Sequence, residues 1–358
     1  MTDKSTNAGV DAQTGFALQR NSALYLLLEE YHNKFKEKNY FICLEHHDDF
    51  LFCFLNENDE AEIIEAYQSK KKSPDTWKLD TELINIITKL LTTGKLLISD
   101  VFPKSNNYKH ILFFTSNQTT NLVVKEYNKV VASVSIRENN PLVSYNSLDN
   151  KMQTKIIDGI NDNELHDELN NLQFIYIDLN RTVEKQINEL VGQLGKVFGE
   201  SIYNKEAAVK TLIELFRDIE ERYNKGNVAK LLDNTKRVTS SQIEDVFNLL
   251  TSKSKCFEYW RSKKREVAQI LKIRPVERET FEFAFNTAFD FFKSYKEAEH
   301  RKILEFIKEN LANCTTYTDE ENVAELVTMY LENDSTHLGT VEFKAVVFAA
   351  FYEVTNKH

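Results

Sequence analysis

Cysteine is scarce in this chain, and no two cysteines lie close together. The four cysteines, Cys43, Cys53, Cys256 and Cys314, are far apart and form no CxxC pair. Zinc knuckles bring their ligands together through short cysteine spacings, and disulfide-stapled domains carry many more cysteines for their length. We therefore expect neither a zinc site nor a disulfide framework, and we interpret the four cysteines as reduced core residues.

The sequence also lacks a long apolar segment and a basic leader. No uninterrupted apolar run approaches the ~20 residues that a membrane span requires. The opening MTDKSTNAGVDAQTG is polar and contains an early acidic residue, whereas a secretory signal starts with basic residues followed by an apolar stretch. Hydrophobic residues at 42% and charged residues at 28% are typical of a globular protein. We expect a cytoplasmic protein without a membrane partner.

An excess of positive charge is missing as well. The formal net charge is −10 at pH 7, and a protein that coats nucleic acid nonspecifically needs a clustered excess of Lys and Arg. A nuclease remains compatible with this charge, because such an enzyme brings a few cations and a metal ion to a local groove while acidic surface elsewhere keeps it soluble. The charge therefore excludes a nonspecific coat protein and leaves phosphodiester chemistry open.

The first hundred residues alternate between helical and strand patterns. Apolar residues recur at helical spacing over Phe16–Lys38. The stretch YFICLEHHDDFLFCFL then favours two strands with a polar junction at 45–49, and AEIIEAYQSKKK favours a third strand that runs into solvent at its lysines. Helical spacing returns over Leu79–Leu91, with Gly94 as a plausible end of that helix.

Two later apolar runs complete the predicted α/β core. HILFFTS, from His110, and LQFIYIDL, from Leu172, read as buried strands, and a helix is expected over Thr182–Phe198. The order is αβββαβ with a further strand and helix, and 117–168 is interpreted as an insertion. From Lys205 onward nearly every segment has helical spacing. With 358 residues we expect two domains, 1–200 with the α/β core and 201–358 all-α.

One group of polar residues has the pattern of a metal-dependent hydrolase. Glu45, Asp48 and Asp49 lie at the junction of the first two strands, and the third strand carries Gln68 and Lys70. Side chains alternate along a strand, so Gln68 and Lys70 share a face that a hairpin can set beside the start of the second strand. Carboxylate and amide oxygens suit Mg²⁺, and a lysine can orient water or stabilise charge on the phosphate. Only one of the adjacent aspartates can face the metal; we prefer Asp49, and Asp48 stays open.

This pattern resembles the PD-(D/E)xK nuclease fold, whose signature is an acid at the start of strand two and (Asp/Glu/Gln)-x-Lys on strand three. Asp49 and Gln68-Ser69-Lys70 match it. The glutamine variant is found in Mrr-like branches and implies weaker metal binding. The resemblance implies a phosphodiesterase that uses Mg²⁺ or Mn²⁺.

A closer resemblance is to the double-stranded DNA endonuclease domains of bacterial antiphage effectors, of the CBASS and Lamassu type. These tend to show GFxxQ, ExxDD and QxK in order, and the chain has Gly15–Gln19, Glu45–Asp49 and Gln68–Lys70. The match spans about residues 14–115. It implies a catalytic set of Lys70, Asp49, Gln68, Glu45 and Gln19, with Asp49, Gln68 and Glu45 as metal ligands. Lys71 and Lys72 are candidates for contacts with the DNA backbone.

The same resemblance implies regulation. An enzyme that cut double-stranded DNA indiscriminately would damage its host, so we expect a sensor partner that holds it inactive and an activation step that brings copies together as a homo-oligomer. The chain is short and helical behind its predicted nuclease, which favours a Lamassu system. An SMC-like ATPase sensor complex with a small accessory subunit is the partner implied, docking on the helical half.

Several other interpretations stay open at this stage. The chain could be a catalytically silent interaction module that retains a nuclease fold as a scaffold, or an RNA nuclease on the same fold. The basic run over Lys253–Arg274 could grip DNA or an acidic partner, although a charged helix face is the ordinary interpretation. The phenylalanines at 281–292 are read as helical core, with a partner interface as the alternative. Gly192–Lys196 lacks the spacing of a phosphate-binding loop.

Overall fold

The computed structural model describes residues 8–44, 49–71, 76–202, 204–220, 231–292 and 298–355. The chain forms two compact units. The first comprises Met1–Val197 and Val209–Ile243, and the second comprises Phe198–Ala208 and Glu244–His358. The two domains expected from the sequence, 1–200 and 201–358, stay a prediction, because compactness does not show which segments fold independently.

The first unit is built on a mixed seven-stranded sheet with the order β10-β1-β2-β3-β5-β9-β8. Strands β3, β5 and β9 run parallel to one another, and the remaining neighbours are antiparallel. The bounds of these strands are β1 Tyr40–Leu44, β2 Phe50–Leu55, β3 Ala61–Ser69, β5 Lys104–Ser116, β8 Leu142–Ser144, β9 Leu172–Tyr176 and β10 Arg237–Thr239. Strand β10, which pairs with β1, lies in a region that the sequence predicts as wholly helical.

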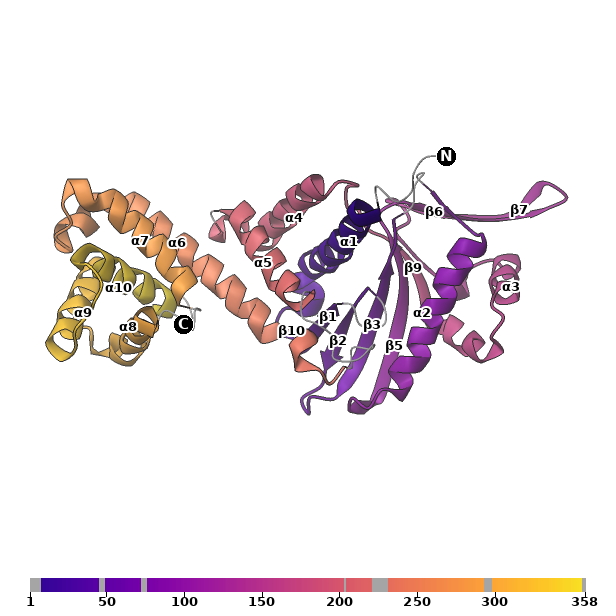
Figure 1. The fold of residues 1–358 in the computed structure, drawn as a ribbon, viewed down its shortest axis with the longest axis horizontal. Helices are drawn as coiled ribbons and strands as arrows, with labels where there is room; N and C mark the ends of the chain where they lie inside the picture. The colour runs from indigo at the N-terminus through magenta and orange to yellow at the C-terminus, as the bar shows by residue number, and fades with distance from the viewer. Residues whose placement is uncertain are drawn as a thin grey trace. The chain divides into compact units, whose positions relative to one another are not determined.

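Helices α1 (Ala8–Glu29) and α2 (Thr81–Ser99) lie on opposite faces of this sheet (Figure 1). Because side chains alternate along a strand, the α2 face receives Leu51 and Ala66, which pack in one core with the apolar side of α2. The opposite face is aromatic: the Tyr67 ring stacks on Phe50 at 4.8 Å and on Phe113 at 4.5 Å. The predicted αβββαβ order is confirmed, and the fold is a restriction-endonuclease-like α/β core.

The end predicted for the second helix is wrong. Gly94 lies inside α2, which continues to Ser99. A Cβ added at Gly94 would collide with the Glu168 carboxylate and would lie 3.0 Å from the Leu112 side chain. Glycine is therefore required here by close packing of the helix against the sheet and against the 3-10 helix Asn163–Asn171, and not by a turn.

The stretch interpreted as an insertion, 117–168, has its own regular structure. A second sheet with the order β4-β6-β7 combines β4 (Thr76–Lys78) with the hairpin of β6 (Thr119–Glu126) and β7 (Lys129–Ile136), and α3 spans Asn150–Gly159. Buried Leu122 and Ile136 join this sheet to the core shared with α2. The alternating, weakly apolar pattern of the hairpin explains why its strands were not assigned from the sequence.

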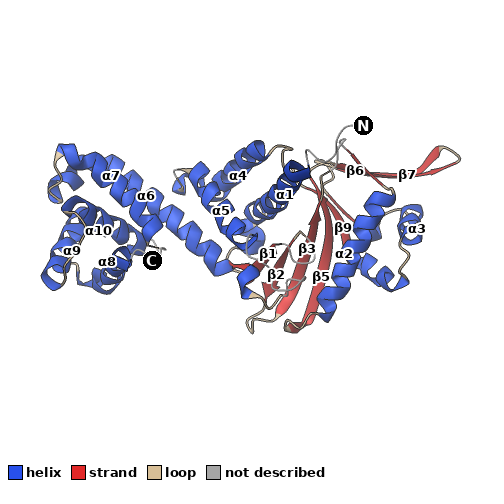
Figure 2. Ribbon diagram, viewed as in Figure 1, coloured by secondary structure: helices blue, strands red, loops and turns tan. Residues whose placement is uncertain are grey.

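The rest of the described chain is helical, as the blue elements of Figure 2 show. Among the phenylalanines at 281–292, Phe281, Phe285 and Phe289 are buried, which confirms the core interpretation for these positions, whereas Phe283 is 74% exposed. No helix in the described residues combines the length and apolar character that a membrane span needs. The remaining helices are α4 Val183–Phe198, α5 Lys205–Glu220, α6 Ser240–Ile270, α7 Arg278–Phe291, α8 Ala298–Asn310, α9 Asp319–Asn333, α10 Thr340–Thr355 and a π-helical turn, Tyr31–Phe35.

The basic run at the end of α6 is largely neutralised within its own unit. Lys253 pairs with Asp290, Lys264 pairs with Glu282, and Lys263 pairs with Glu266. This pairing favours the charged helix face over a DNA-gripping surface. The four cysteines are free, and Cys43, Cys53 and Cys256 are buried, as expected for reduced core residues; Cys314 is only partly buried, so the core interpretation is wrong for that position.

Candidate active site

The candidate site lies at one edge of the seven-stranded sheet, where β3 ends and β2 begins. Asp49 directly precedes β2, and Phe50 on β2 is paired with Tyr67 on β3. This antiparallel register sets Asp49 opposite Gln68 and on the same face of the sheet. The hairpin geometry predicted from the alternation of side chains is therefore present.

The Asp49 carboxylate is the centre of a small hydrogen-bonded cluster. Its Oδ1 accepts a hydrogen bond from Gln68 Nε2 at 2.8 Å, and its Oδ2 accepts one from the backbone N–H of Ser69 at 2.5 Å. The Lys70 ammonium lies 3.3 Å from Oδ1 and 3.4 Å from Oδ2. An acid, an amide and an ammonium thus converge. The contribution of the Ser69 backbone has no sequence signature, because any residue except proline would supply the same N–H at that position.

Asp49 is almost completely buried, with 8% of its surface exposed. Burial raises the pKa of its carboxyl group, and the nearby Lys70 charge together with the hydrogen bonds from Gln68, Lys70 and Ser69 offsets only part of that effect. The ionised carboxylate is therefore incompletely compensated by its protein neighbours. Such a carboxylate gains from any additional cation that reaches it.

Lys70 holds its place through the backbone as well as the side chain. Strand β3 ends at Ser69, so Lys70 and Lys71 lie just beyond the strand. The Lys70 N–H nevertheless donates to the Thr115 carbonyl of β5 at 2.9 Å, which continues the sheet for one more residue. One third of the Lys70 side chain is exposed. The ammonium can therefore meet both Asp49 and a molecule arriving from solvent.

Gln19 is not brought into this cluster by any hydrogen bond of the described residues. Helix α1 approaches the end of β3 one turn further along, where Ser22 Oγ lies 3.4 Å from Ser69 Oγ. The Ser69 side chain alternates to the face opposite Gln68. Gln19 is thus on the helix that covers the reverse face, and its catalytic role stays a prediction.

Three of the other predicted residues lie outside the described residues: Glu45, Asp48 and Lys72. The choice between Asp48 and Asp49 as the metal ligand therefore stays open. Of the two, Asp49 is the one that the structure describes, and it lies beside Lys70. Lys71 is described and exposed, as a contact with a DNA backbone requires. Its role in DNA binding stays a prediction.

The donor set fits a hard divalent cation. Asp49 and Gln68 carry carboxylate and amide oxygens, which are ligands that Mg²⁺ and Mn²⁺ accept, and Mg²⁺ is commonly held by only one or two protein carboxylates. The incomplete compensation of the buried Asp49 charge agrees with a site that receives a cation. Within the described residues no three His, Cys, Asp or Glu side chains cluster in a way that could hold a metal ion. Glu45 and Asp48, the other two predicted acids, lie outside these residues.

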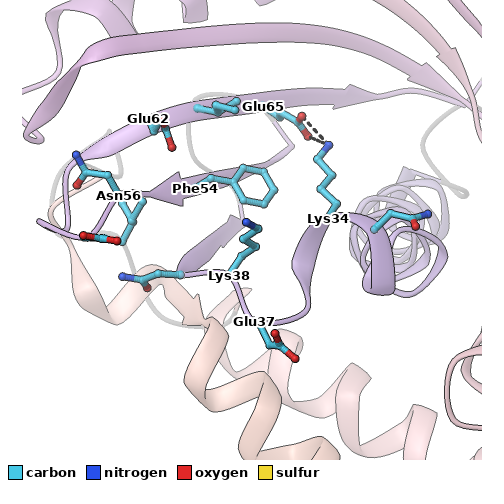
Figure 3. Close-up of a pocket in the computed structure, with 12 residues that line it drawn as sticks. Lys34, Glu37, Lys38, Phe54, Asn56, Glu62 and Glu65 are labelled. Carbon is cyan, nitrogen blue, oxygen red and sulfur yellow. Dashed lines mark hydrogen bonds and ion pairs between the residues drawn. The ribbon is translucent and has the colours of Figure 1, made fainter.

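A separate pocket of about 680 Å³ lies at the opposite end of the β2–β3 hairpin (Figure 3). Its wall includes Phe54, Glu62 and the ion pair of Lys34 with Glu65, in which Lys34 Nζ lies 2.6 Å from Glu65 Oε1. Tyr67 donates a further hydrogen bond to Glu65 at 2.8 Å. The buried Glu65 carboxylate is satisfied by these partners.

The comparisons with known proteins agree with the geometry at the sheet edge. Residues 7–222, more than half of the chain, match the family model described as "Cap4, dsDNA endonuclease domain". No curated protein and no solved structure matches the chain. The matched range ends two residues beyond Glu220, whose carboxylate pairs with Arg20 of α1 at 2.7 Å. This ion pair therefore links the first helix of the matched range to its last segment. The resemblance to antiphage DNA nucleases is confirmed at this level, and the chain belongs to the family of Cap4 double-stranded DNA endonuclease domains, nuclease effectors of antiphage defence.

Proposed function

We propose that this chain is a metal-dependent enzyme that hydrolyses phosphodiester bonds in double-stranded DNA, with Asp49, Gln68 and Lys70 as its core site. The observation that supports this most directly is that the three side chains converge at one end of the strands. The Gln68 amide and the Lys70 ammonium both lie within 3.4 Å of the Asp49 carboxylate. Membership of the family supports DNA as the substrate.

In this proposal the side-chain oxygens of Asp49 and Gln68 hold Mg²⁺ or Mn²⁺, with Glu45 or Asp48 as additional acids. The bound ion supplies Lewis acidity toward the phosphate and lowers the pKa of a bound water. Asp49 is fixed in place by the Ser69 N–H, so it need not reorganise when a cation arrives. Lys70, partly exposed beside it, stabilises negative charge that develops on the phosphate oxygens.

The proposal also includes regulation by a partner protein. We propose that the helical region behind the nuclease docks on a sensor, of the SMC-like ATPase type with a small accessory subunit as in Lamassu systems, and that activation assembles several copies. Exposed apolar side chains in the helical unit support a docking role, among them Val276 at 82% and Phe283 at 74% exposure.

The decisive experiment compares Lys70→Ala and Asp49→Asn with the wild type. Full-length proteins are incubated with supercoiled plasmid in Mg²⁺, Mn²⁺ or EDTA, and the same variants are tested for protection against phage in cells. We expect both variants to lose plasmid cleavage and protection, and EDTA to abolish wild-type cleavage. Lys89→Ala, which removes an exposed lysine of α2 that has no proposed role, is the control and should retain wild-type activity.

Persistence of cleavage in Lys70→Ala at the wild-type rate would refute catalysis by this site. If both variants still protected cells as well as the wild type does, the protein would instead be a scaffold that retains the nuclease fold. Matched DNA and RNA duplexes in the same assay separate a DNA nuclease from an RNA nuclease.

A further inference from the structure

The β6–β7 hairpin begins at the same edge of the sheet as the candidate active site. Strand β5 ends at Ser116 and β6 starts at Thr119, immediately after the Thr115 carbonyl that binds the Lys70 N–H at 2.9 Å. Figure 1 shows the hairpin running outward from this edge beyond α3. The root of the hairpin and the catalytic candidates are therefore neighbours.

The root is firmly anchored. Trp77 of β4 is buried and donates a hydrogen bond from Nε1 to Ser116 Oγ at 3.1 Å, and β4 pairs with β6 from Thr76 and Thr119 onward. The inner half of the hairpin buries Leu122 and Ile136 in the core. An element held in this way has a defined direction relative to the sheet edge, as a substrate-positioning arm requires.

The outer half of the hairpin leaves the core abruptly. The pairing of β6 with β7 is irregular between Val124 and Lys125, and every residue from Lys125 to Val131 is exposed. A bulge at such a point bends the strand and redirects what lies beyond it. The tip therefore contributes nothing to the core of this unit and is free to meet another molecule.

The turn at the tip carries an unfavourable residue. Tyr127 and Asn128 form a two-residue connection between Glu126 and Lys129, with φ values of +48° and +63°. Glycine, asparagine and aspartate are the residues that suit such a turn, whereas an aromatic residue at positive φ is strained. Tyr127 is completely exposed, so packing does not compensate for the strain. Residues held in strained conformations without a packing benefit often serve a binding function.

The charged side chains at the tip that form no ion pair with a described residue are both lysines. Lys151 of α3 neutralises Glu126 at 3.0 Å, while Lys125 and Lys129 form no ion pair with any described residue. Two cations on either side of a protruding aromatic ring suit a DNA duplex, because the cations can contact phosphates and a two-stranded β-ribbon fits the major groove. Another copy of this chain could pair with the edge of β7, but lysines on an edge strand oppose such pairing.

The length of the hairpin suits the same ligand. Strand β6 has 8 residues, and at about 3.3 Å per residue the tip can lie roughly 26 Å from the root. That distance is within one helical turn of B-DNA, about 34 Å. We propose that the β6–β7 hairpin is a DNA-binding arm, in which Tyr127 enters a groove and Lys125 and Lys129 contact the backbone of the duplex whose cleavage the sheet edge carries out. This inference rests on the proposed function.

The test measures duplex binding apart from cleavage. A fluorescent 30-base-pair duplex is titrated with full-length protein in EDTA, by anisotropy, at several salt concentrations between 50 and 200 mM. For Lys125→Ala/Lys129→Ala we expect weaker binding and a plot of log affinity against log salt that is shallower by about 2, since each lost phosphate contact removes about 0.9 from the slope. For Tyr127→Gly, in which glycine relaxes the turn, we expect severalfold weaker binding with an unchanged slope.

The matched controls are Lys89→Ala/Lys109→Ala, two exposed lysines elsewhere on the same unit, and Tyr317→Ala, a fully exposed tyrosine of the helical unit. These should bind the duplex like the wild type. Thermal denaturation verifies that every variant is folded, and Tyr127→Gly should be at least as stable as the wild type.

Unchanged affinity and salt slope in folded arm variants would overturn the inference, while loss of cleavage in Lys70→Ala would still support the proposed function. Conversely, wild-type cleavage in Lys70→Ala would refute the site without touching the arm, whose role is decided by the affinity and the slope. Sedimentation velocity gives the remaining outcome: arm variants that dissociate into monomers with unaltered duplex affinity would make the hairpin a contact between copies and would refute DNA binding by it.

Discussion

Asp49 and Glu168 are two carboxylates of the same unit, 8% and 3% exposed, with opposite surroundings. Burial would raise the pKa of Glu168, but hydrogen bonds from His110 and Asn171, at 2.6 and 3.1 Å, outweigh burial and lower it. Asp49 has Gln68, Ser69 and a more distant Lys70 as partners, and its pKa stays raised. Two carboxylates that are both shielded from solvent therefore have pKa values shifted in opposite directions.

The difference separates a structural carboxylate from a candidate functional one. Glu168 is satisfied by fixed neutral and basic partners and lies beneath α2, against Gly94. The charge of Asp49 is only partly compensated by the partly exposed Lys70, as expected for a carboxylate that binds a cation. Four experiments can break or sharpen this contrast.

The largest expected effect is on cleavage. Asp49→Asn removes the charge that the proposed metal needs, and we expect a rate loss on the order of a thousandfold. Glu168→Gln keeps the shape of its side chain and should cleave plasmid within about threefold of the wild type at 20 °C. Initial rates on supercoiled plasmid measure both, and equal losses in the two variants would erase the distinction between the carboxylates.

Stability should respond in the opposite way. Glu168→Ala leaves His110 and Asn171 without their shared partner in a buried site, and we expect a loss of about 3 kcal/mol in the free energy of unfolding. Asp49→Asn removes an incompletely compensated buried charge and should not lower the melting temperature. Thermal denaturation of full-length protein at pH 7 tests this, and a marked destabilisation by Asp49→Asn would show that its charge is structural.

The close contact of α2 with Glu168 gives a prediction of intermediate size. Gly94→Ala inserts a methyl group against the Glu168 carboxylate and Leu112, so we expect a loss of about 1–3 kcal/mol in unfolding free energy despite the better helix propensity of alanine. Gly192→Ala, inside α4 with no atom near the added Cβ, is the control and should stabilise by roughly 0.5–1 kcal/mol. Urea unfolding distinguishes the two, and similar effects at both positions would contradict the packing argument.

The pH dependence of stability should give the smallest effect. Because the pKa of Glu168 is lowered in the folded state, its stabilisation is complete above its ordinary value of 4.5 and is lost as pH falls below that value. The raised pKa of Asp49 acts in reverse, since the folded state loses stability as pH rises above 3.8. Relative to the wild type, Glu168→Gln should therefore be closest in stability at low pH, and Asp49→Asn should gain as pH rises. Urea midpoints between pH 3.5 and 7 measure these trends, and parallel curves would contradict them.

The sequence by itself determined the αβββαβ order of the core, the later strand and helix over 172–198, and the residues of the candidate site, but not the elements within 117–168. Strong local patterns made this possible: short β-favouring apolar runs at 40–44 and 50–55, helical spacing in α2 and α4, and an acid, Asp49, that directly precedes a strand. These signals are local, and neighbours in sequence are enough to read them.

Only the tertiary structure decided the remainder, because the causes are contacts between distant segments. Gly94 reads as a helix end until Glu168 and Leu112 close around it, and β10 forms only because β1 offers it an open edge. The Ser69 N–H that holds Asp49 depends on backbone geometry, which residue identity does not encode. The exposed tip at Tyr127 likewise became visible only once burial assigned the inner half of its hairpin to the core.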